Sequence, residues 1–245
     1  MRKIPKIIHY CWFGKGEKPD NTKAYIASWK EKLPEYTFME WNEENFDVSN
    51  SIPYVQQAYE AKKYAFVSDY VRIQALYQYG GIYLDTDVEV RKPFEAFLEE
   101  ASMVLGFESQ RSLLTAFIAV EKEHLYIGEF LASYENRVFQ RKDGTFDMTV
   151  INEGFSKLME EKGVDLDRNE YQELSGNIVV YPIEYFCGFD VVNWHENITE
   201  NTYTVHYMNS SWVSGSGGIK RKAIQTLQKI LGYQTYDKLR KTLKG

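Results

Sequence analysis

Short apolar runs alternate with amphipathic segments along the first third of the chain, and the runs end in polar or glycine-containing loops. The β-branched run 6–10 predicts a buried strand, a helical pattern follows over 24–33, and a second strand is expected over 36–40. This strand–helix–strand order predicts an α/β fold with parallel strands covered by helices. Since ligands of such sheets bind where strands end, Trp12 and Asn42, in the loops after the two strands, become candidate binding residues.

A longer helical pattern occupies residues 68–79 and ends at two glycines, Gly80 and Gly81. Ser68 is expected to be its N-cap, Asp69 is expected in its first turn, and the glycines are expected to supply a left-handed end. Asp69 and Arg72 are three residues apart and therefore share one helix face. They can form a surface ion pair or hold a common ligand.

The glycines lead into a short apolar strand that ends in Asp85, Thr86 and Asp87. Side chains alternate along a strand, so Asp85 and Asp87 are expected to project to the same side. Two carboxylates leave the rest of a coordination shell open for water and phosphate, as a Mg²⁺ or Mn²⁺ site requires. Taken alone, the pattern Asp-x-Asp is equally compatible with a solvated turn.

Similar alternation continues through the rest of the chain. We expect strands over 104–107, 178–181 and 203–207 and helices over 54–64, 126–137 and 153–162, whereas the apolar run 113–120 fits a buried strand or a helix. His206 lies near the end of the last strand, before a polar loop with Ser210, Ser211 and Trp212. In a parallel sheet this loop would share one edge with the two aspartates. The histidine is then either a metal ligand or a structural residue.

Composition excludes some classes of function. The 245 residues carry a net charge of -6, which argues against a general nucleic-acid binder, because binding to phosphate backbones depends on clustered basic residues. With no apolar run of bilayer-spanning length and no apolar N-terminal signal, we expect a cytoplasmic protein. Cys11 and Cys187 stand beside aromatic residues and are expected to be buried free thiols, although a single disulfide is also compatible with the sequence.

Charge divides the chain into two expected parts, a domain over 1–218 and a basic amphipathic helical segment over 219–245. The second part carries a net charge of +7 and the first -13. Two interpretations of the basic segment are open: a helix docked on the core with a solvated face, or a helix that contacts an anionic membrane surface at its cytoplasmic side.

Three segments in order, 4–14, 64–72 and 79–87, resemble glycosyltransferases of family 32 with a DXD sugar-binding region. Segment 204–212 is similar to the family's terminal His and Ser-x-Trp elements. The family includes capsular polysaccharide and mannosyl transferases, and its core resembles the glucosylating bacterial toxins. The resemblance implies a GT-A fold with a mixed, mostly parallel sheet flanked by helices, a nucleotide-sugar donor, a divalent metal ion, and retention of anomeric configuration.

The resemblance also implies roles for single residues. The metal would be held by Asp87, with Asp85 binding hydroxyls or reaching the metal through water and His206 as a further metal ligand. Arg72 would neutralise charge on the donor, so Asp87, Arg72 and Asp85 are the candidate catalytic residues. The donor would be contacted by residues from every motif: Trp12 on the base, Asn42, Ser68, Asp69, Tyr83, Asp85, Ser210, Ser211 and Trp212.

The expected function is therefore transfer of a hexose from a nucleotide sugar to a glycan or lipid-linked glycan acceptor in bacterial cell-surface polysaccharide synthesis, with Mn²⁺ or Mg²⁺. A UDP-sugar is favoured over GDP-mannose by similarity alone. No carboxylate is singled out as nucleophile or base.

Two other classes are weighed against the transferase. A haloacid-dehalogenase phosphatase also places apolar residues before Asp-x-Asp, but its motif needs Thr or Val where Glu89 stands here. A non-catalytic sugar- or Ca²⁺-binding module would bind ligands without hydrolysing a donor.

Overall fold

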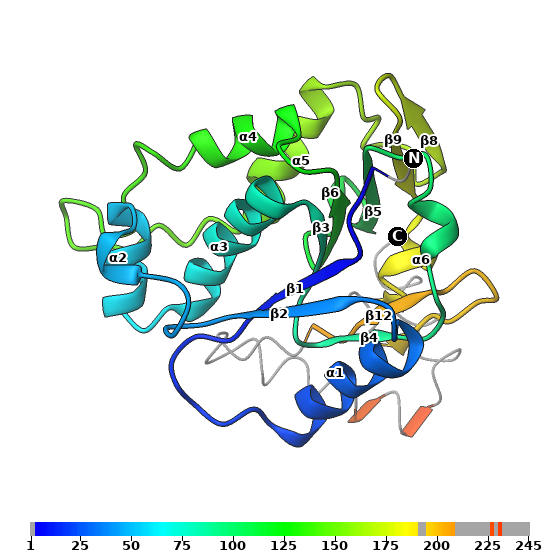
Figure 1. Cartoon of the computed structure of the whole chain (residues 1–245), viewed down its shortest axis with the longest axis horizontal. Helices are drawn as coiled ribbons and strands as arrows, with labels where there is room; N and C mark the ends of the chain where they lie inside the picture. The colour runs from blue at the N-terminus through cyan, green and yellow to red at the C-terminus, as the bar shows by residue number, and fades with distance from the viewer. Residues whose placement is uncertain (1–2, 191–194, 209–225, 228–229, 232–245) are drawn as a thin grey trace.

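A mixed eight-stranded sheet organises the chain (Figure 1). The computed structural model describes residues 3–190, 195–208, 226–227 and 230–231. The strands of the sheet are β1 (Ile7–Cys11), β2 (Thr37–Trp41), β3 (Gly81–Leu84), β5 (Met103–Ser109), β6 (Ser112–Leu113), β7 (Phe117–Val120), β8 (Gln172–Leu174) and β9 (Ile178–Tyr181). Their order is β2-β1-β3-β7-β5-β9-β8, with β6 paired to β5. In this sheet β2, β1, β3, β5 and β9 run in one direction, and β6, β7 and β8 run in the other.

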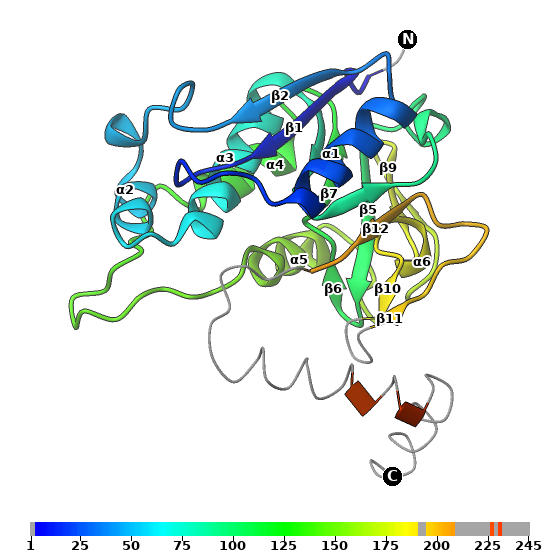
Figure 2. The ribbon, with the colours of Figure 1, turned by 90° about the horizontal axis from the view of Figure 1, so that it is seen from below.

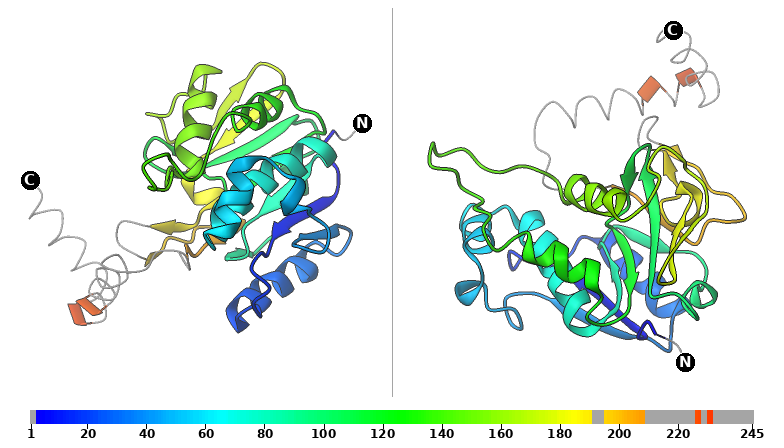
Figure 3. Two further views of the ribbon diagram at one scale, coloured as in Figure 1. Left: turned by 90° about the vertical axis from the view of Figure 1, so that its left-hand side faces the viewer. Right: turned by 90° about the horizontal axis from the view of Figure 1, so that it is seen from above.

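Helices cover both faces of the sheet, as Figure 3 shows. The α-helices are α1 (Asp20–Lys32), α2 (Pro53–Glu60), α3 (Tyr64–Tyr79), α4 (Leu125–Ala132), α5 (Ile151–Glu161) and α6 (Ile183–Phe186), and the 3-10 helices are η1 (Val48–Asn50) and η2 (Glu95–Phe97). One apolar core lies between the sheet and α2, α3, α4 and α5. The other core lies under α1, α6 and the segment around Phe94. The expected α/β fold is confirmed.

A second, two-stranded sheet lies beside the first and is formed by β4 (Val88–Val90) and β12 (Thr204–His206), which run antiparallel. Figure 1 labels β12 beside β4, and Figure 2 shows β12 from below. Helix α1 packs on β4, where the Trp29 indole N–H donates a 2.7 Å hydrogen bond to the Val88 carbonyl. A further short pair joins β10 (Phe189–Asp190) and β11 (His195–Glu196).

The expected start of the helix before the glycines is wrong. Helix α3 begins at Tyr64, so Ser68 lies a full turn inside the helix and is not its N-cap, and Asp69 is not in its first turn. A sharp turn with Lys62 in the left-handed region (φ 56°) separates α2 from α3. The apolar face of α3 begins at once with Phe66 and Val67, which are buried, and this packing extends the helix toward its N-terminus.

The expected strand through the two aspartates is also wrong. Strand β3 ends at Leu84, and residues 85–88 form a turn in which the Val88 N–H donates a 3.0 Å hydrogen bond to the Asp85 carbonyl. The glycine stop is confirmed: Gly80 and Gly81 both have positive φ, 64° and 104°.

Two later segments resolve questions that the pattern left open. The apolar run 113–120 begins with the last residue of β6 and ends in β7, so it is strand rather than helix. The strand that ends at His206 does not join the main sheet but pairs with β4, so the expected parallel edge does not include it.

Cys11 and Cys187 are buried free thiols, as expected. In the part of the chain that the structure describes, no helix is both long and apolar enough to cross a bilayer. The predicted boundary at residue 218 and nearly all of segment 219–245 lie outside the described residues.

Candidate functional site

Arg72 of α3 links two carboxylates at the end of β3. Its Nη2 lies 3.1 Å from Asp69 Oδ1 and 3.0 Å from Asp85 Oδ1. The Nη1 group donates a 2.7 Å hydrogen bond to the Thr115 carbonyl, and the guanidinium lies 4.5 Å from the centre of the Tyr83 ring. The Tyr83 hydroxyl donates a 3.0 Å hydrogen bond to Asp85 Oδ1. The Asp85 carboxylate is therefore held from two sides by side chains of α3 and β3.

Burial disfavours the charged forms of the side chains in this ion-pair network. Arg72 is 4% exposed and Asp69 is 9% exposed. Burial raises the pKa of Asp69 to about 7, against the attraction of the Arg72 guanidinium. Burial also works against the charge of Arg72, but the neighbouring Asp85, Tyr83 and Asp69 outweigh it and raise the pKa of that side chain. Arg72 therefore stays charged, and its Nη1 and Nη2 groups are paired with protein acceptors.

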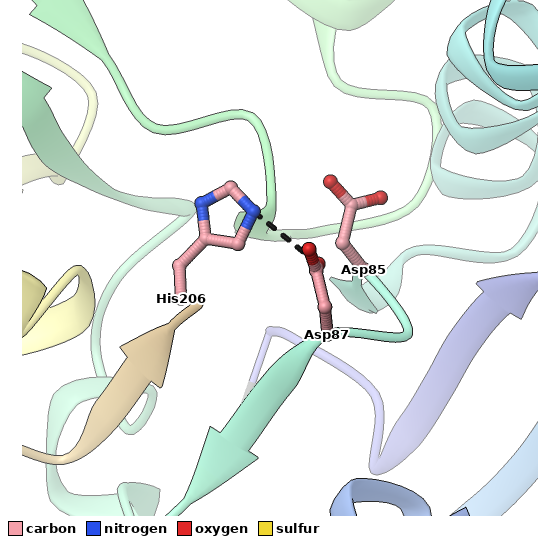
Figure 4. A group of neighbouring side chains, drawn as sticks. All are labelled: Asp85, Asp87 and His206. Atoms are coloured by element: carbon pink, nitrogen blue, oxygen red, sulfur yellow. Dashed lines mark ion pairs between the residues drawn. The ribbon is translucent and has the colours of Figure 1, made fainter. Parts of the chain in front are cut away.

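His206 reaches the aspartates because β12 pairs with β4. In that antiparallel ladder His206 lies opposite Val88, and the Tyr207 N–H donates a 3.0 Å hydrogen bond to the Asp87 carbonyl. The His206 imidazole then stands beside the Asp87 carboxylate, with Nε2 3.3 Å from Oδ1 (Figure 4). The antiparallel pairing of β4 and β12 thus brings His206 next to Asp87, although the two residues are far apart in the sequence.

Asp85, Asp87 and His206 form a group with the chemistry of a metal site. One ligand atom from each lies within 4.8 Å of the others. Figure 4 shows the three side chains, with Asp85 and Asp87 in the turn between β3 and β4 and His206 at the end of β12. Two carboxylates and an imidazole suit Mn²⁺, and the carboxylates also suit Mg²⁺. The donor set therefore fits a divalent ion with coordination positions left for a ligand's oxygens.

The charge state of His206 reflects this environment. Burial lowers its pKa, but the Asp87 and Glu108 carboxylates outweigh that effect and raise the pKa to about 9. Without a metal the ring is therefore protonated at neutral pH. A metal ion that binds Nε2 must displace this proton, so its affinity rises with pH.

Sequence reasoning missed Glu108 and Asn152. Glu108 lies near the end of β5, with Oε1 3.7 Å from His206 Nδ1, and its Oε2 accepts a 3.1 Å hydrogen bond from the Asn152 side chain. A carboxylate directly after the predicted strand 104–107 was the available signal, and it is weak because such residues are common in loops.

The residues predicted to contact the donor take several different places. Tyr83 and Asp69 lie beside Arg72, as described above, and Ser68 is half-buried in α3. The Trp12 indole N–H donates a 2.6 Å hydrogen bond to the Gly16 carbonyl, in the loop that follows β1. The Asn42 side chain accepts a 2.8 Å hydrogen bond from the Glu44 N–H and thus shapes its own loop after β2.

These two loops border a polar hollow of ≈ 500 Å³. Its lining residues come from the loops after β1 and β2 and from α2: Lys15, Glu43, Glu44, Asn45, Phe46, Asp47, Val48 and Tyr59. Because β1, β2 and β3 are parallel, these loops and Asp85 lie at the same edge of the sheet. Ser210, Ser211 and Trp212 lie outside the described residues.

Comparison with known proteins agrees with this geometry. Residues 19–104 match the family described as "Glycosyltransferase sugar-binding region containing DXD motif". Inositol phosphoceramide mannosyltransferase 1 of Schizosaccharomyces pombe is 26% identical over 165 residues, which are 60% of this chain and 48% of that protein. Lactosylceramide 4-alpha-galactosyltransferase of Rattus norvegicus is 36% identical over 88 residues, 34% of this chain and 23% of that protein.

Among solved structures, the PaToxG glycosyltransferase is similar with a TM-score of 0.51 and 19% identity, over 65% of this chain and 69% of that one. The fold is therefore that of the GT-A glycosyltransferases. The chain carries the DXD-containing glycosyltransferase sugar-binding region, and the resemblance to the family 32 enzymes is confirmed. It spans about half or less of the length of these curated relatives.

Proposed function

We propose that this protein is a metal-dependent, retaining glycosyltransferase that moves a hexose from a nucleotide-diphosphate sugar to a glycan or lipid-linked glycan. The observation that carries the proposal is the group of Asp85, Asp87 and His206, which stands beside the buried Arg72. Both aspartates lie inside the matched DXD region, residues 19–104.

The residues of the group have separate tasks in this proposal. Asp87 and His206 bind the divalent ion directly. Asp85 completes the coordination shell of the ion or accepts a hydrogen bond from a hydroxyl of the nucleotide sugar. Such an ion, when bound, stabilises the negative charge that develops on the departing nucleoside diphosphate. Arg72 and the Tyr83 hydroxyl fix the Asp85 carboxylate in one orientation, which lowers the cost of organising the site when the donor binds.

The donor we propose is a UDP-sugar, with the base near Trp12 and the loops that border the polar hollow. The adjoining loops after β1 and β2 supply an aromatic surface and hydrogen-bonding groups, which suits a nucleoside. Ser68, Asp69, Asn42 and the loop with Ser210, Ser211 and Trp212 are the other proposed donor contacts.

For the acceptor we propose a lipid-linked glycan in cell-surface polysaccharide synthesis at the cytoplasmic side of a membrane. Two of the similar proteins are named for ceramide-based substrates, inositol phosphoceramide and lactosylceramide. The basic segment 219–245, with a net charge of +7, would contribute about 1 kcal/mol per basic residue near an anionic surface. Removing residues 220–245 should reduce binding to vesicles that contain anionic lipid and leave donor hydrolysis intact; equal vesicle binding by both chains would contradict the membrane role.

A donor screen tests the proposed activity. The full chain is incubated with UDP- and GDP-sugars and Mn²⁺, and release of nucleoside diphosphate is measured with and without a chelator. We expect metal-dependent hydrolysis of one UDP-sugar, since water can replace the acceptor slowly in such a site. Saturable donor binding without any hydrolysis or transfer would instead support the non-catalytic module.

A further inference from the structure

Glu108 occupies an irregular point of the sheet next to the metal group. In the β5–β6 pair Phe107 lies opposite Leu113 and Ser109 opposite Ser112, so the register shifts at Glu108. Such irregularities redirect a side chain from the direction that regular alternation would give it. The Glu108 side chain is mostly buried, and its Oε1 lies 3.7 Å from His206 Nδ1.

The Glu108 carboxylate is itself held in place by Asn152, at the start of α5. The Asn152 side-chain N–H donates to Glu108 Oε2 at 3.1 Å and to the Leu113 carbonyl at 2.9 Å. The Asn152 side-chain oxygen accepts a 2.9 Å hydrogen bond from the Thr115 hydroxyl. All polar groups of this amide are thus matched with suitable partners, which fixes both its orientation and the position of Glu108.

The His206 ring lies between two carboxylates. Nε2 faces Asp87 at 3.3 Å, whereas Nδ1 is buried and has no hydrogen-bond partner among the described residues. Glu108 Oε1, an acceptor just beyond hydrogen-bond distance, faces that nitrogen. A histidine that binds a metal through one nitrogen commonly donates its other N–H to a carboxylate, and this contact fixes the ring and its tautomer.

We propose that Glu108 is a positioning residue, held by Asn152, that accepts the Nδ1–H of His206 and turns the Nε2 lone pair toward Asp85 and Asp87. The inference rests on the proposed metal-dependent function and adds to it a residue that neither the DXD motif nor the chain's other motifs include. Glu108 acts through His206 and does not itself touch the ion.

A simpler electrostatic account makes a different prediction. If Glu108 only adds negative charge near the ion, any variant that keeps the charge should bind the ion as the wild type does. If Glu108 positions His206, then moving its carboxylate should weaken binding even when the charge is kept. Glu108→Asp and Asn152→Ala both keep the charge and disturb the position, whereas Glu108→Gln removes the charge.

The test is the affinity of the full chain for Mn²⁺ alone, measured by the electron paramagnetic resonance signal of free Mn²⁺. We expect Glu108→Gln to weaken binding about tenfold, and Glu108→Asp and Asn152→Ala to weaken it clearly too, with the folding of each variant checked by circular dichroism. Glu129→Gln, which removes a surface carboxylate paired with Lys162, is the control and should bind Mn²⁺ normally.

Two results would overturn the inference. Normal affinity in Glu108→Gln would remove any role for the carboxylate, and normal affinity in both charge-preserving variants would leave only a charge effect. If Asn152→Ala does not fold, Glu108→Asp alone decides between the two accounts. Wild-type Mn²⁺ binding without donor hydrolysis would instead contradict the proposed function and leave the positioning role standing, so the two failures can be told apart.

Discussion

His9 makes a prediction about how stability depends on pH. The side chain is fully buried in β1, and its Nε2–H donates a 2.8 Å hydrogen bond to the Gly80 carbonyl, at the end of α3. Its Nδ1 accepts a 3.2 Å hydrogen bond from the Trp41 indole N–H. This arrangement requires the neutral ring, because a proton on Nδ1 would face the Trp41 donor. His9 thereby ties β1 and β2 to the glycine turn that leads into β3.

The magnitude follows from the pKa. Burial lowers the pKa of His9 from 6.5 to about 4, although the bond to the Gly80 carbonyl opposes this. Between these values the unfolded chain binds one proton more than the folded chain, so the free energy of unfolding falls as the pH falls. At about 1.4 kcal/mol per pKa unit, the loss is about 3 kcal/mol. It is absent above pH 6.5 and complete near pH 4.

The assay compares the wild type with His9→Gln, whose amide has a donor and an acceptor but does not titrate. Urea unfolding is followed between pH 4 and 7.5, and the difference in free energy of unfolding between the two chains is plotted against pH. The wild type should lose about 3 kcal/mol more than the variant as the pH falls to 4. Parallel curves would refute the neutral, buried state of His9.

Two further substitutions test the supports of the site. Gly80→Ala should lower the free energy of unfolding by at least about 2 kcal/mol in urea titrations, because a Cβ would come within 2.6 Å of a backbone nitrogen at a φ of +64°. Gly16→Ala, where nothing lies within 4 Å, is its control, and equal effects would contradict the strain argument. Arg72→Met should cost about 3–5 kcal/mol by thermal unfolding, because it leaves Asp85 and a second carboxylate without a counter-charge. The exposed Arg168→Met should not change the unfolding midpoint; a stable Arg72→Met would show that the buried network is dispensable.

Local sequence patterns predicted several elements of this fold and several residues near the site. The glycines after α3 mark the end of a helix in the sequence, and the two aspartates mark the end of the strand β3. Apolar and polar residues alternate in the strand that ends at His206. The sequence predicted His206 at one edge of the main sheet with the aspartates; His206 does lie beside Asp87, but because β12 pairs with β4 and not with the main sheet. Pairing between strands more than 100 residues apart is a non-local choice that periodicity does not encode.

Other features could not be read from the sequence for related reasons. The start of α3 depended on tertiary burial of Phe66 and Val67, which outweighed the capping signal of Ser68. Glu108 and Asn152 are 44 residues apart, and only the packing of α5 against the β5–β6 pair brings them together. Candidate site residues in local motifs could thus be nominated from the sequence, whereas those brought into the group only by packing could not.

The most direct test of the proposed function is Mn²⁺-dependent hydrolysis of the best UDP-sugar by the wild type and by Asp87→Asn, at matched protein concentration and with folding checked by circular dichroism. The amide keeps the shape of the side chain but removes the charge that binds the ion, so the variant should fold normally and lose turnover by about 100-fold or more. Asp143→Asn, at an exposed turn, should retain wild-type activity. Wild-type turnover by Asp87→Asn would contradict the metal site on which the proposed function rests.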